Sequence, residues 1–245
     1  MSDGKAGGTP PPEKPPERWL SFLGFVIVAK ADLLAAAAFL LSVVGLVYQF
    51  SAWVRGPKPS LYAPDVVYVF FDAYANNRVV TRVAGQLSLV NSGAMGHDAI
   101  VRSIEATVVV RGQPVTVQNW MSFASVTRKE RDLVVTPLES AHPFPVNAGS
   151  AVSRMISFAP GDIACFAGAG PAAPGCDPDK WFVTDSDFLN RIAGASELRL
   201  DFSAAIVGLD QPVKASCTMA AGTGLLQYLA ENNWFAARCR PVDAR

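Results

Sequence analysis

The hydrophobic pattern of the chain is dominated by one long run without a charged residue. From 33 to 54, in LLAAAAFLLSVVGLVYQFSAWV, apolar residues lie on every side of the helix that the run predicts. At about 1.5 Å per residue such a helix is about 33 Å long, enough for the roughly 30 Å hydrocarbon core of a bilayer. Trp19 before the run and Tyr48 and Trp53 near its end fit the headgroup level, where aromatic rings are favoured. The pattern therefore predicts one transmembrane helix.

Polar and proline-rich sequence precedes this run. Residues 1–18 are rich in glycine, proline and charge and cannot bury enough apolar surface to fold, which predicts a disordered tail. Residues 19–32 are apolar until Lys30 and Asp32, and one helix over 19–54 would be about 54 Å long, more than a bilayer requires. The two charges lie either at the membrane interface or inside the membrane. We expect the interface, because buried charges are costly and long side chains near a helix end reach the headgroups.

A different pattern follows a proline-rich linker at 55–64. From 65 to 245, runs dense in β-branched and aromatic residues alternate with turn clusters, which predicts a mostly β domain. Several runs alternate polar with apolar positions, as in a sheet that is solvated on one face, and short turns between many strands favour an antiparallel β-sandwich. The expected strands are 65–71, 79–90, 99–110, 114–121, 131–136, 150–158, 196–207 and 213–220.

One strand end resembles a known kind of domain. The segment 89–93, LVNSG, and the restart of the next strand at Ala99 resemble the strand–turn–strand of bacterial immunoglobulin-like domains. The resemblance rests on a turn tripeptide. It implies an immunoglobulin-like β-sandwich and implies no function.

Two short helices are expected as insertions in this domain. In 184–194, Thr184 and Asp187 have the spacing of an N-terminal capping box, and Gly194 can end the helix. A second helix is expected at 224–233, between the last two cysteines.

Composition and charge exclude one class of partner. The 245 residues are 50% hydrophobic, which is ample for a core, and 21 basic residues balance 21 acidic ones. After the apolar run the charges are scattered singly, so the domain has no basic face that could release counterions from a nucleic acid. We expect no nucleic-acid partner.

The cysteines indicate the compartment of the domain. Cys165, Cys176, Cys217 and Cys239 all follow the apolar run, contain no CxxC pair and have no histidine among them, so they read as two disulfides. Of the three possible connectivities we expect Cys165–Cys176 and Cys217–Cys239, because each closes a short loop. Disulfides persist outside the cytosol, whereas the basic residues flanking the helix give only a weak bias. The sequence thus predicts an inner-membrane protein with a cytoplasmic N-terminus and a periplasmic C-terminal domain.

Neither histidine carries a convincing catalytic pattern. His97 precedes Asp98 in a glycine-rich loop and Ser92 is near in sequence, but nearness in sequence is not a triad, and no Gly-x-Ser-x-Gly elbow is present. His142 stands in the loop SAHPFPV. We read both as loop residues and expect no catalytic residue.

Metal and cofactor patterns are equally weak. Asp177, Asp179, Asp185 and Asp187 could supply oxygens to calcium, but their spacing matches no calcium loop and a turn and a helix cap explain them. The glycines near 168–170 and 222–224 lack the context of a phosphate-binding loop. We expect no metal and no cofactor.

The apolar run carries a stripe of small residues. Every third or fourth position bears a small side chain or a single amide, while leucines and valines occupy the opposite face. Such a stripe lets another helix approach closely, which predicts packing against another membrane protein or a second copy. Its members are Ala31, Ala35, Ala38, Ser42, Gly45, Gln49 and Ala52.

These features favour a non-catalytic function. We expect a membrane-anchored exported protein that binds or organises another membrane or envelope component, as an accessory or scaffold subunit. The alternative is an extracytoplasmic ligand-binding or sensing module, followed by an envelope enzyme. Copurification with a membrane complex would favour the accessory or scaffold subunit. A well-formed pocket would favour the ligand-binding or sensing module. His97 facing a cleft beside a nucleophile would favour the envelope enzyme.

Overall fold

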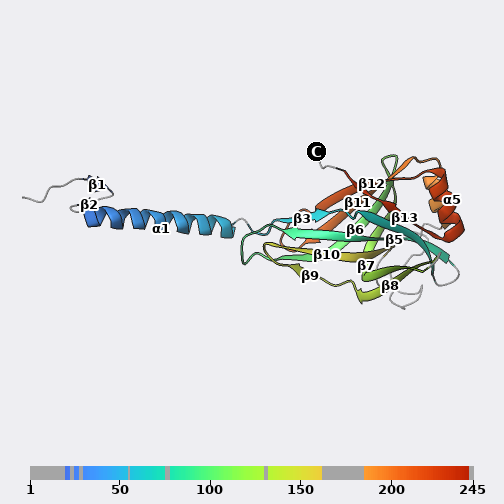
Figure 1. Ribbon diagram of the computed structural model, residues 1–245, viewed down its shortest axis with the longest axis horizontal. Coiled ribbons are helices and arrows are strands. Elements are labelled where there is room, and N and C mark those ends of the chain that lie inside the picture. Colours follow the sequence, from blue (N-terminus) through green and yellow to red (C-terminus); the bar gives the residue numbers. More distant parts are fainter. Residues whose placement is uncertain are drawn as a thin grey trace, which may run out of the picture. The chain divides into compact units, whose positions relative to one another are not determined.

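The computed structural model describes residues 20–22, 25–27, 30–54, 56–74, 78–129, 132–161 and 185–242. The chain divides into two compact units, residues 1–54 and 55–245, each described by itself. The first holds the hairpin of β1 (Leu20–Phe22) and β2 (Phe25–Ile27) and the helix α1 (Lys30–Val54) (Figure 1).

The helix is shorter than the sequence predicts. Residues 20–27 were expected to continue it towards the tail, yet Leu20 pairs with Ile27 and Phe22 with Phe25 in an antiparallel ladder. The β-branched residues Val26 and Ile27 favour extended chain, and Gly24 weakens a helix. Because α1 begins at Lys30, that residue and Asp32 stand in its first turn.

The central part of α1 is apolar and uncovered. One window, Leu34–Ser51, has a mean hydropathy of 1.9, and none of it is buried within the chain. Leu34, Leu41 and Tyr48 expose 71%, 73% and 75% of their surface. By length and composition, this is one helix that could cross a membrane.

The second unit is mostly β. Its strands are β3 (Pro59–Tyr62), β4 (Val66–Tyr74), β5 (Arg78–Asn91), β6 (Ala99–Val110), β7 (Gln113–Lys129), β8 (Asp132–Ser140), β9 (Phe144–Val146), β10 (Ser150–Pro160), β11 (Glu197–Ile206), β12 (Val213–Ala220), β13 (Trp234–Arg238) and β14 (Arg240–Pro241). Its described helices are α4 (Asp185–Ile192) and α5 (Thr223–Asn232). All eight expected strands and both expected helices are therefore present, with ends that differ by a few residues and with β7 extended to Lys129. The short strands β3, β9, β13 and β14 were not expected.

The twelve strands described in this unit all belong to one antiparallel sheet. Neighbouring strands follow the order β13-β4-β5-β10-β7-β6-β11-β12-β14, and β3, β8 and β9 pair with β5, β7 and β6. The first and last members of that order, β13 and β14, are consecutive in sequence. The segment 234–241 pairs with β4 through Trp234–Arg238 and then with β12 through Arg240 and Pro241, so it joins the two ends of the sheet.

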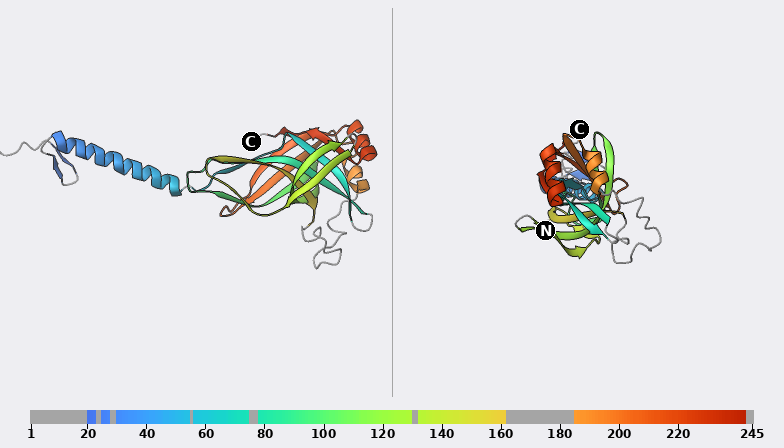
Figure 2. Two further views of the ribbon diagram at one scale, coloured as in Figure 1. Left: turned by 60° about the horizontal axis from the view of Figure 1, so that its bottom comes forward. Right: turned by 90° about the vertical axis from the view of Figure 1, so that its right-hand side faces the viewer.

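The sheet consequently curls nearly into a barrel (Figure 2). The expected immunoglobulin-like sandwich is not confirmed, because its two stacked sheets are replaced by one sheet that returns to its own first strand. Alternation along a strand shows which side chains face a core, but a sandwich and a barrel share that alternation. The mostly β, antiparallel character of the domain is confirmed.

The joint between the sheet ends carries the expected disulfide. Cys217 of β12 bonds to Cys239, which lies between β13 and β14, with a Cα–Cα distance of 5.4 Å. The Cys239 backbone N–H also donates to the Asp65 carbonyl oxygen at 2.8 Å, just before β4. One residue thus fastens both ends of the sheet. Cys165 and Cys176 lie outside the described residues.

Apolar side chains fill the inside of the sheet. Inward positions of β5, β10 and β11 supply Leu87, Phe158 and Phe202, which are almost fully buried. At one end α4 and α5 close the core, with Phe188 and Leu229 completely buried (Figure 2). Gly194, with a φ of +70°, ends the turn after α4 as expected.

Candidate docking groove beside the strand joint

The nearly closed sheet stays open along one line, between β3 and β12. β3 pairs with β5 through Pro59–Tyr62, and β12 pairs with β11 along its length. On its other side β12 pairs only at Cys217 and Thr218, with β14. Among the described residues no ladder joins β3 to β12. The two strands therefore present unpaired edges to each other, with Cα atoms that come within 8 Å.

Hydrogen bonds at the ends of these strands show which backbone groups face the gap. The Val242 N–H donates to the Ser216 carbonyl oxygen at 2.9 Å. The backbone N–H and C=O groups of the even-numbered residues of β12 therefore point away from β11. Successive residues of a strand point their N–H and C=O groups to opposite sides, so Lys214 directs both groups to the gap. The Ser216 N–H points the same way. Among the described residues, no strand pairs with Lys214 on that side.

The same reasoning applies to β3. The Ser92 N–H donates to the Lys58 carbonyl oxygen at 3.0 Å. The backbone N–H and C=O groups of the even-numbered residues of β3 therefore point towards β5. The N–H and C=O of Leu61 then point towards the gap. Pro59 has no N–H to offer, which is typical of an edge strand.

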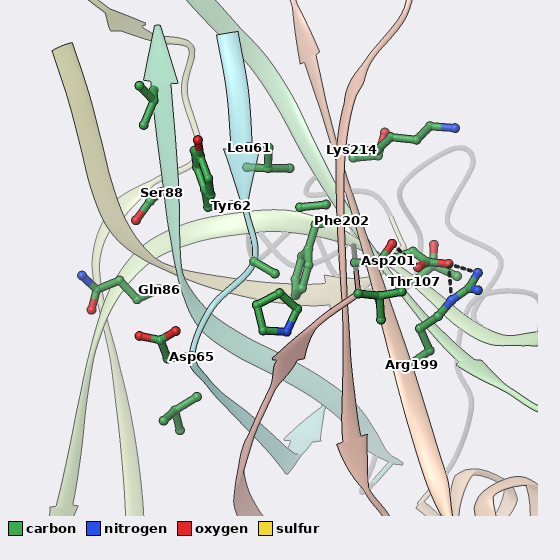
Figure 3. A pocket seen from close by; sticks show the side chains of 18 of the residues that line it. Leu61, Tyr62, Asp65, Gln86, Ser88, Thr107, Arg199, Asp201, Phe202 and Lys214 are labelled. Carbon is green, nitrogen blue, oxygen red and sulfur yellow. Dashed lines mark hydrogen bonds and ion pairs between the residues drawn. The ribbon is translucent and has the colours of Figure 1, made fainter. Parts of the chain in front are cut away.

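The gap is the bottom of a groove of about 1360 Å³. Leu61 of β3 and Phe202 of β11 lie at its base and are 7% and 1% exposed. Figure 3 shows Tyr62, Gln86 and Ser88 on one side of these residues and Arg199, Asp201 and Lys214 on the other. The groove is thus apolar at its base and polar along its sides.

Large apolar side chains gather along the same groove. Tyr62, Val66 and Val242 are 55%, 36% and 41% exposed, and all three line it. Tyr68 and Met155 add partly buried surface. Exposed apolar surface beside unpaired strand edges is typical of a binding site rather than of a solvated wall.

The far wall is held by a small polar network. The Arg199 guanidinium donates to Asp201 Oδ2 at 2.7 Å, and the Ser216 hydroxyl donates to Asp201 Oδ1 at 2.7 Å (Figure 3). These bonds link the Asp201 carboxylate of β11 to Arg199 of the same strand and to Ser216 of β12. They neutralise the charges of Arg199 and Asp201 against each other.

The structure does not assemble a catalytic group around His97. The Ser92 hydroxyl donates to the Lys58 carbonyl oxygen, and Asp98 Oδ1 accepts from the Ala148 N–H at 3.0 Å. His97 Nε2 is buried and has no partner among the described residues. Ser92, His97 and Asp98 therefore have separate structural roles.

The other suspected residues have local roles. His142 Nδ1 lies 2.9 Å from the Ser140 carbonyl oxygen, and its ring meets Phe123 edge-on at a centroid distance of 5.6 Å. Asp185 accepts from the Ser186 N–H in the first turn of α4, where Asp187 also lies. No cluster of three or more metal-ligating side chains occurs among the described residues. Asp177 and Asp179 lie outside them.

The members of the small-residue stripe whose side chains are described remain uncovered. These are Ala35, Ala38, Ser42, Gly45 and Gln49, and a Cβ added at Gly45 would meet nothing within 4 Å. The Ser42 hydroxyl donates to the Ala38 carbonyl oxygen at 2.9 Å within the helix. The stripe is thus open to a neighbour. Nothing is described of the side chains of Ala31 and Ala52.

Sequence reasoning missed this groove because two of its walls look like linker. β3 lies in the proline-rich segment 55–64, and β14 contains Pro241. Proline is tolerated in edge strands, where its missing N–H would face no ladder partner. The alternation of Ser60, Leu61 and Tyr62 between two prolines was a usable signal for an edge strand.

Comparisons with protein-family models, with curated proteins and with solved structures find no match to this chain.

Proposed function

We propose that this chain is a non-catalytic protein of the inner membrane that binds or organises another membrane or envelope component. Its N-terminus is cytoplasmic, α1 is the anchor, and the β domain is periplasmic. The protein acts as an accessory or scaffold subunit, with its helix and its domain each offering a surface to partners.

The uncovered apolar helix carries the anchoring part of the proposal. A core helix of a soluble protein buries most of its apolar surface, whereas none of Leu34–Ser51 is buried within the chain. Exposing this surface to water would be strongly unfavourable, at about 25 cal/mol for each Å². A bilayer removes that cost, and the first-turn position of Lys30 and Asp32 allows both charges to remain at its interface.

The disulfide supports the placement of the domain. Cys217 and Cys239 are bonded at the joint that closes the sheet, and their side chains are buried. Structural disulfides form and persist in oxidising compartments. A domain fastened in this way is best suited to the periplasm.

The groove and the stripe support a binding role. The site that the geometry builds best combines an apolar base with backbone groups unpaired among the described residues, and the described residues around His97 do not form a catalytic set. Small residues along α1 allow a second helix to pack closely. The groove also favours the alternative of a ligand-binding or sensing module, because it could receive a small apolar molecule.

Reporter fusions test the topology. Fusions after Ser60 and after Arg245 should be active only as exported enzymes, and the chain should stay in the membrane after alkaline extraction. A cytosolic reporter that is active at either position, or release of the intact chain by alkali, would contradict the proposal.

Gentle detergent extraction tests the binding role. We expect a defined membrane or envelope protein to copurify with the full chain and to be lost when α1 is replaced by an unrelated membrane helix or the groove is altered. Recovery of the chain alone, with a small molecule retained in the domain, would favour the sensing alternative.

A further inference from the structure

We propose that the β domain rests on the phospholipid bilayer with the end at which the chain enters it, and inserts the side chains of Met95, Ile100 and Val207 into the headgroup layer. This inference rests on the proposed function, because it requires α1 to span the membrane, and it adds that one end of the domain binds lipid. The end is called the entry end below and comprises residues 56–58, the turns 92–98, 147–149 and 207–212, and the strand residues next to them.

The strand register places these turns at one end of the sheet. Asn91 ends β5 and pairs both with Pro59, the first residue of β3, and with Ser150, the first residue of β10. The Val207 N–H, just after the end of β11, donates to the carbonyl oxygen of Ile100 near the start of β6 at 2.9 Å. The helices α4 and α5 lie at the other end, because α4 precedes the start of β11 and α5 follows the end of β12 (Figure 1).

Little chain separates α1 from the entry end. A Cβ added at Gly93 would lie 3.0 Å from Pro57 Cα and 3.2 Å from the Gly56 carbonyl oxygen, so the turn 92–98 packs directly against these residues. The helix ends at Val54, and one residue separates it from Gly56. Because consecutive Cα atoms are about 3.8 Å apart, Gly56 lies within about 7.6 Å of Val54.

That short distance keeps the turn 92–98 at the membrane surface. The apolar window of α1 ends at Ser51, and the three further residues to Val54 rise only about 4.5 Å along the helix. A bilayer is about 40–45 Å thick with its headgroups and about 30 Å without them, so each headgroup layer is roughly 5–8 Å deep. Gly56 and the turn packed against it therefore lie at the headgroups or just above them, whichever way the domain is tilted.

Large apolar side chains are uncovered among the described residues of the entry end. Met95, in the turn 92–98, exposes 89% of its surface. Ile100 and Val207 are 43% and 53% exposed. They stand opposite each other across the ladder of β6 and β11, so both side chains point to the outer face of the sheet. Exposed apolar side chains gathered in one place typically mark an interaction surface, and a membrane interface is the surface nearest to this one.

The charges of the entry end do not account for an attraction to lipid. The charged residues in 56–58 and the three turns are Lys58, Asp98 and Asp210, two carboxylates against one ammonium group. Asp98 Oδ1 already accepts from the Ala148 N–H. An anionic surface would repel this balance of charge. Docking consequently depends on the burial of apolar side chains.

The test uses the full chain in nanodiscs of phosphatidylcholine, with a photoreactive phenylalanine analogue in place of Met95 or of Val207. Irradiation should join both positions to phospholipid, which mass spectrometry detects as adducts of lipid mass. The matched control is Val117, which is similarly exposed at 48% and lies opposite Thr107 of β6. Thr107 is eight residues from the start of that strand, about 26 Å away, so lipid adducts at Val117 should be about tenfold fewer. Absence of lipid adducts at both test positions, or equal yields at all three, would overturn the proposal.

A charge in the turn tests the apolar contribution. Met95→Asp should lower the lipid adducts formed by a probe at Val207 about fivefold, because the turn then gains nothing from apolar burial. Met95→Leu keeps an apolar side chain and should keep the yield within about twofold. The control is Leu138→Asp on β8, which replaces an apolar residue exposed at 68% and should leave the yield unchanged. Equal yields from Met95→Asp and the parent would contradict the proposal.

Lipid composition separates apolar docking from electrostatic binding. The adduct yields at Met95 and Val207 should not change when about a fifth of the lipid is phosphatidylglycerol, or when salt is raised to about 0.5 M. A yield that needs anionic lipid, or that falls with salt, would show that charged groups hold the domain and would overturn the proposal.

Two outcomes separate this inference from the proposed function. If the same photoreactive positions join a protein instead of lipid in native membranes, the entry end is a protein interface, and this proposal fails while the binding role stands. If alkali releases the intact chain or the domain proves to be cytosolic, the proposed function fails and this inference fails with it.

Discussion

The side chain of Asn91 accepts a hydrogen bond from the backbone of Lys58, a residue distant in sequence: the Lys58 N–H donates to Asn91 Oδ1 at 3.1 Å. Asn91 is completely buried at the end of β5, and its Oδ1 also accepts from the Gly93 N–H at 3.0 Å. Its amide nitrogen donates to the carbonyl oxygens of His97 and Val146 at 2.8 and 3.1 Å. One side chain thus ties the segment before β3, the loop after β5 and strand β9 together.

Replacement of Asn91 should therefore destabilise the domain. Asn91→Ala leaves four backbone groups without their partner, and we expect the free energy of unfolding to fall by about 3 kcal/mol. Asn91→Asp should be no milder, because a carboxylate cannot donate to the two carbonyl oxygens. Chemical denaturation of both variants measures the loss. The exposed Asn147, replaced by alanine, is the control and should change stability by less than about 0.5 kcal/mol.

Gly85 makes a close contact that only glycine permits. A Cβ at this position would lie 2.9 Å from Pro64 Cγ, and the ring of Pro64 cannot turn away as a flexible side chain would. We expect Gly85→Ala to cost about 1–3 kcal/mol through overpacking. Gly224→Ala is the matched comparison, because nothing lies within 4 Å of its Cβ position and it stands inside α5. Thermal unfolding should show opposite signs, with Gly224→Ala stabilising by up to about 1 kcal/mol.

The disulfide at the joint should stabilise the closure of the sheet more than it stabilises the packing of the core. Cys217 and Cys239 are 22 residues apart, and loss of a link of that length costs about 3 kcal/mol by chain entropy. In the double variant Cys217→Ala, Cys239→Ala, hydrogen exchange should rise first in 234–241, where the segment changes from β4 to β12. Exchange that rises uniformly would show that the joint has no separate stability.

Peptide mapping without reduction tests the pairing of Cys165 and Cys176, which lie outside the described residues. We expect the Cys217–Cys239 link together with Cys165–Cys176. A peptide that joins Cys165 to Cys217, or free thiols at Cys165 and Cys176, would contradict this prediction.

The local pattern of apolar and polar residues predicted the strands and helices of the domain well. The expected strands 99–110 and 213–220 match β6 and β12 residue for residue, because runs of β-branched and apolar residues bounded by turns mark their ends. Closure was not predictable in that way. It depends on the short segment 234–241, whose two pairing partners, β4 and β12, lie far apart in sequence.

The candidate groove was less accessible to sequence reasoning than the fold. Its base combines Leu61 with Phe202, and no spacing rule connects residues so distant in sequence. The polar groups that define it belong to the backbone of Lys214 and Leu61, so residue type gives no sign of them. Only the strand register shows that these edges are unpaired.

The stripe on α1 leads to the last prediction, that it packs against another transmembrane helix. A helix surrounded by lipid gains nothing from small residues, whereas a helix–helix contact gains from every atom that approaches the partner backbone. The Ser42 hydroxyl already donates to the Ala38 carbonyl oxygen, so its own contribution to a contact should be small and Ser42→Ala should be tolerated. Gln49 is the remaining polar member, and a partner could satisfy its amide for about 0.5–1.5 kcal/mol.

Two substitutions on the stripe and one on the opposite face test this packing. Ala38→Leu and Gly45→Ile fill the space at the stripe and should lower oligomerisation or partner recovery without changing insertion or the amount of protein. Leu40→Ile, on the opposite face, should change neither. Crosslinking and copurification from the same membranes measure the three variants side by side. If all three match the parent, helix packing does not use the stripe, and the binding function would have to reside in the β domain alone.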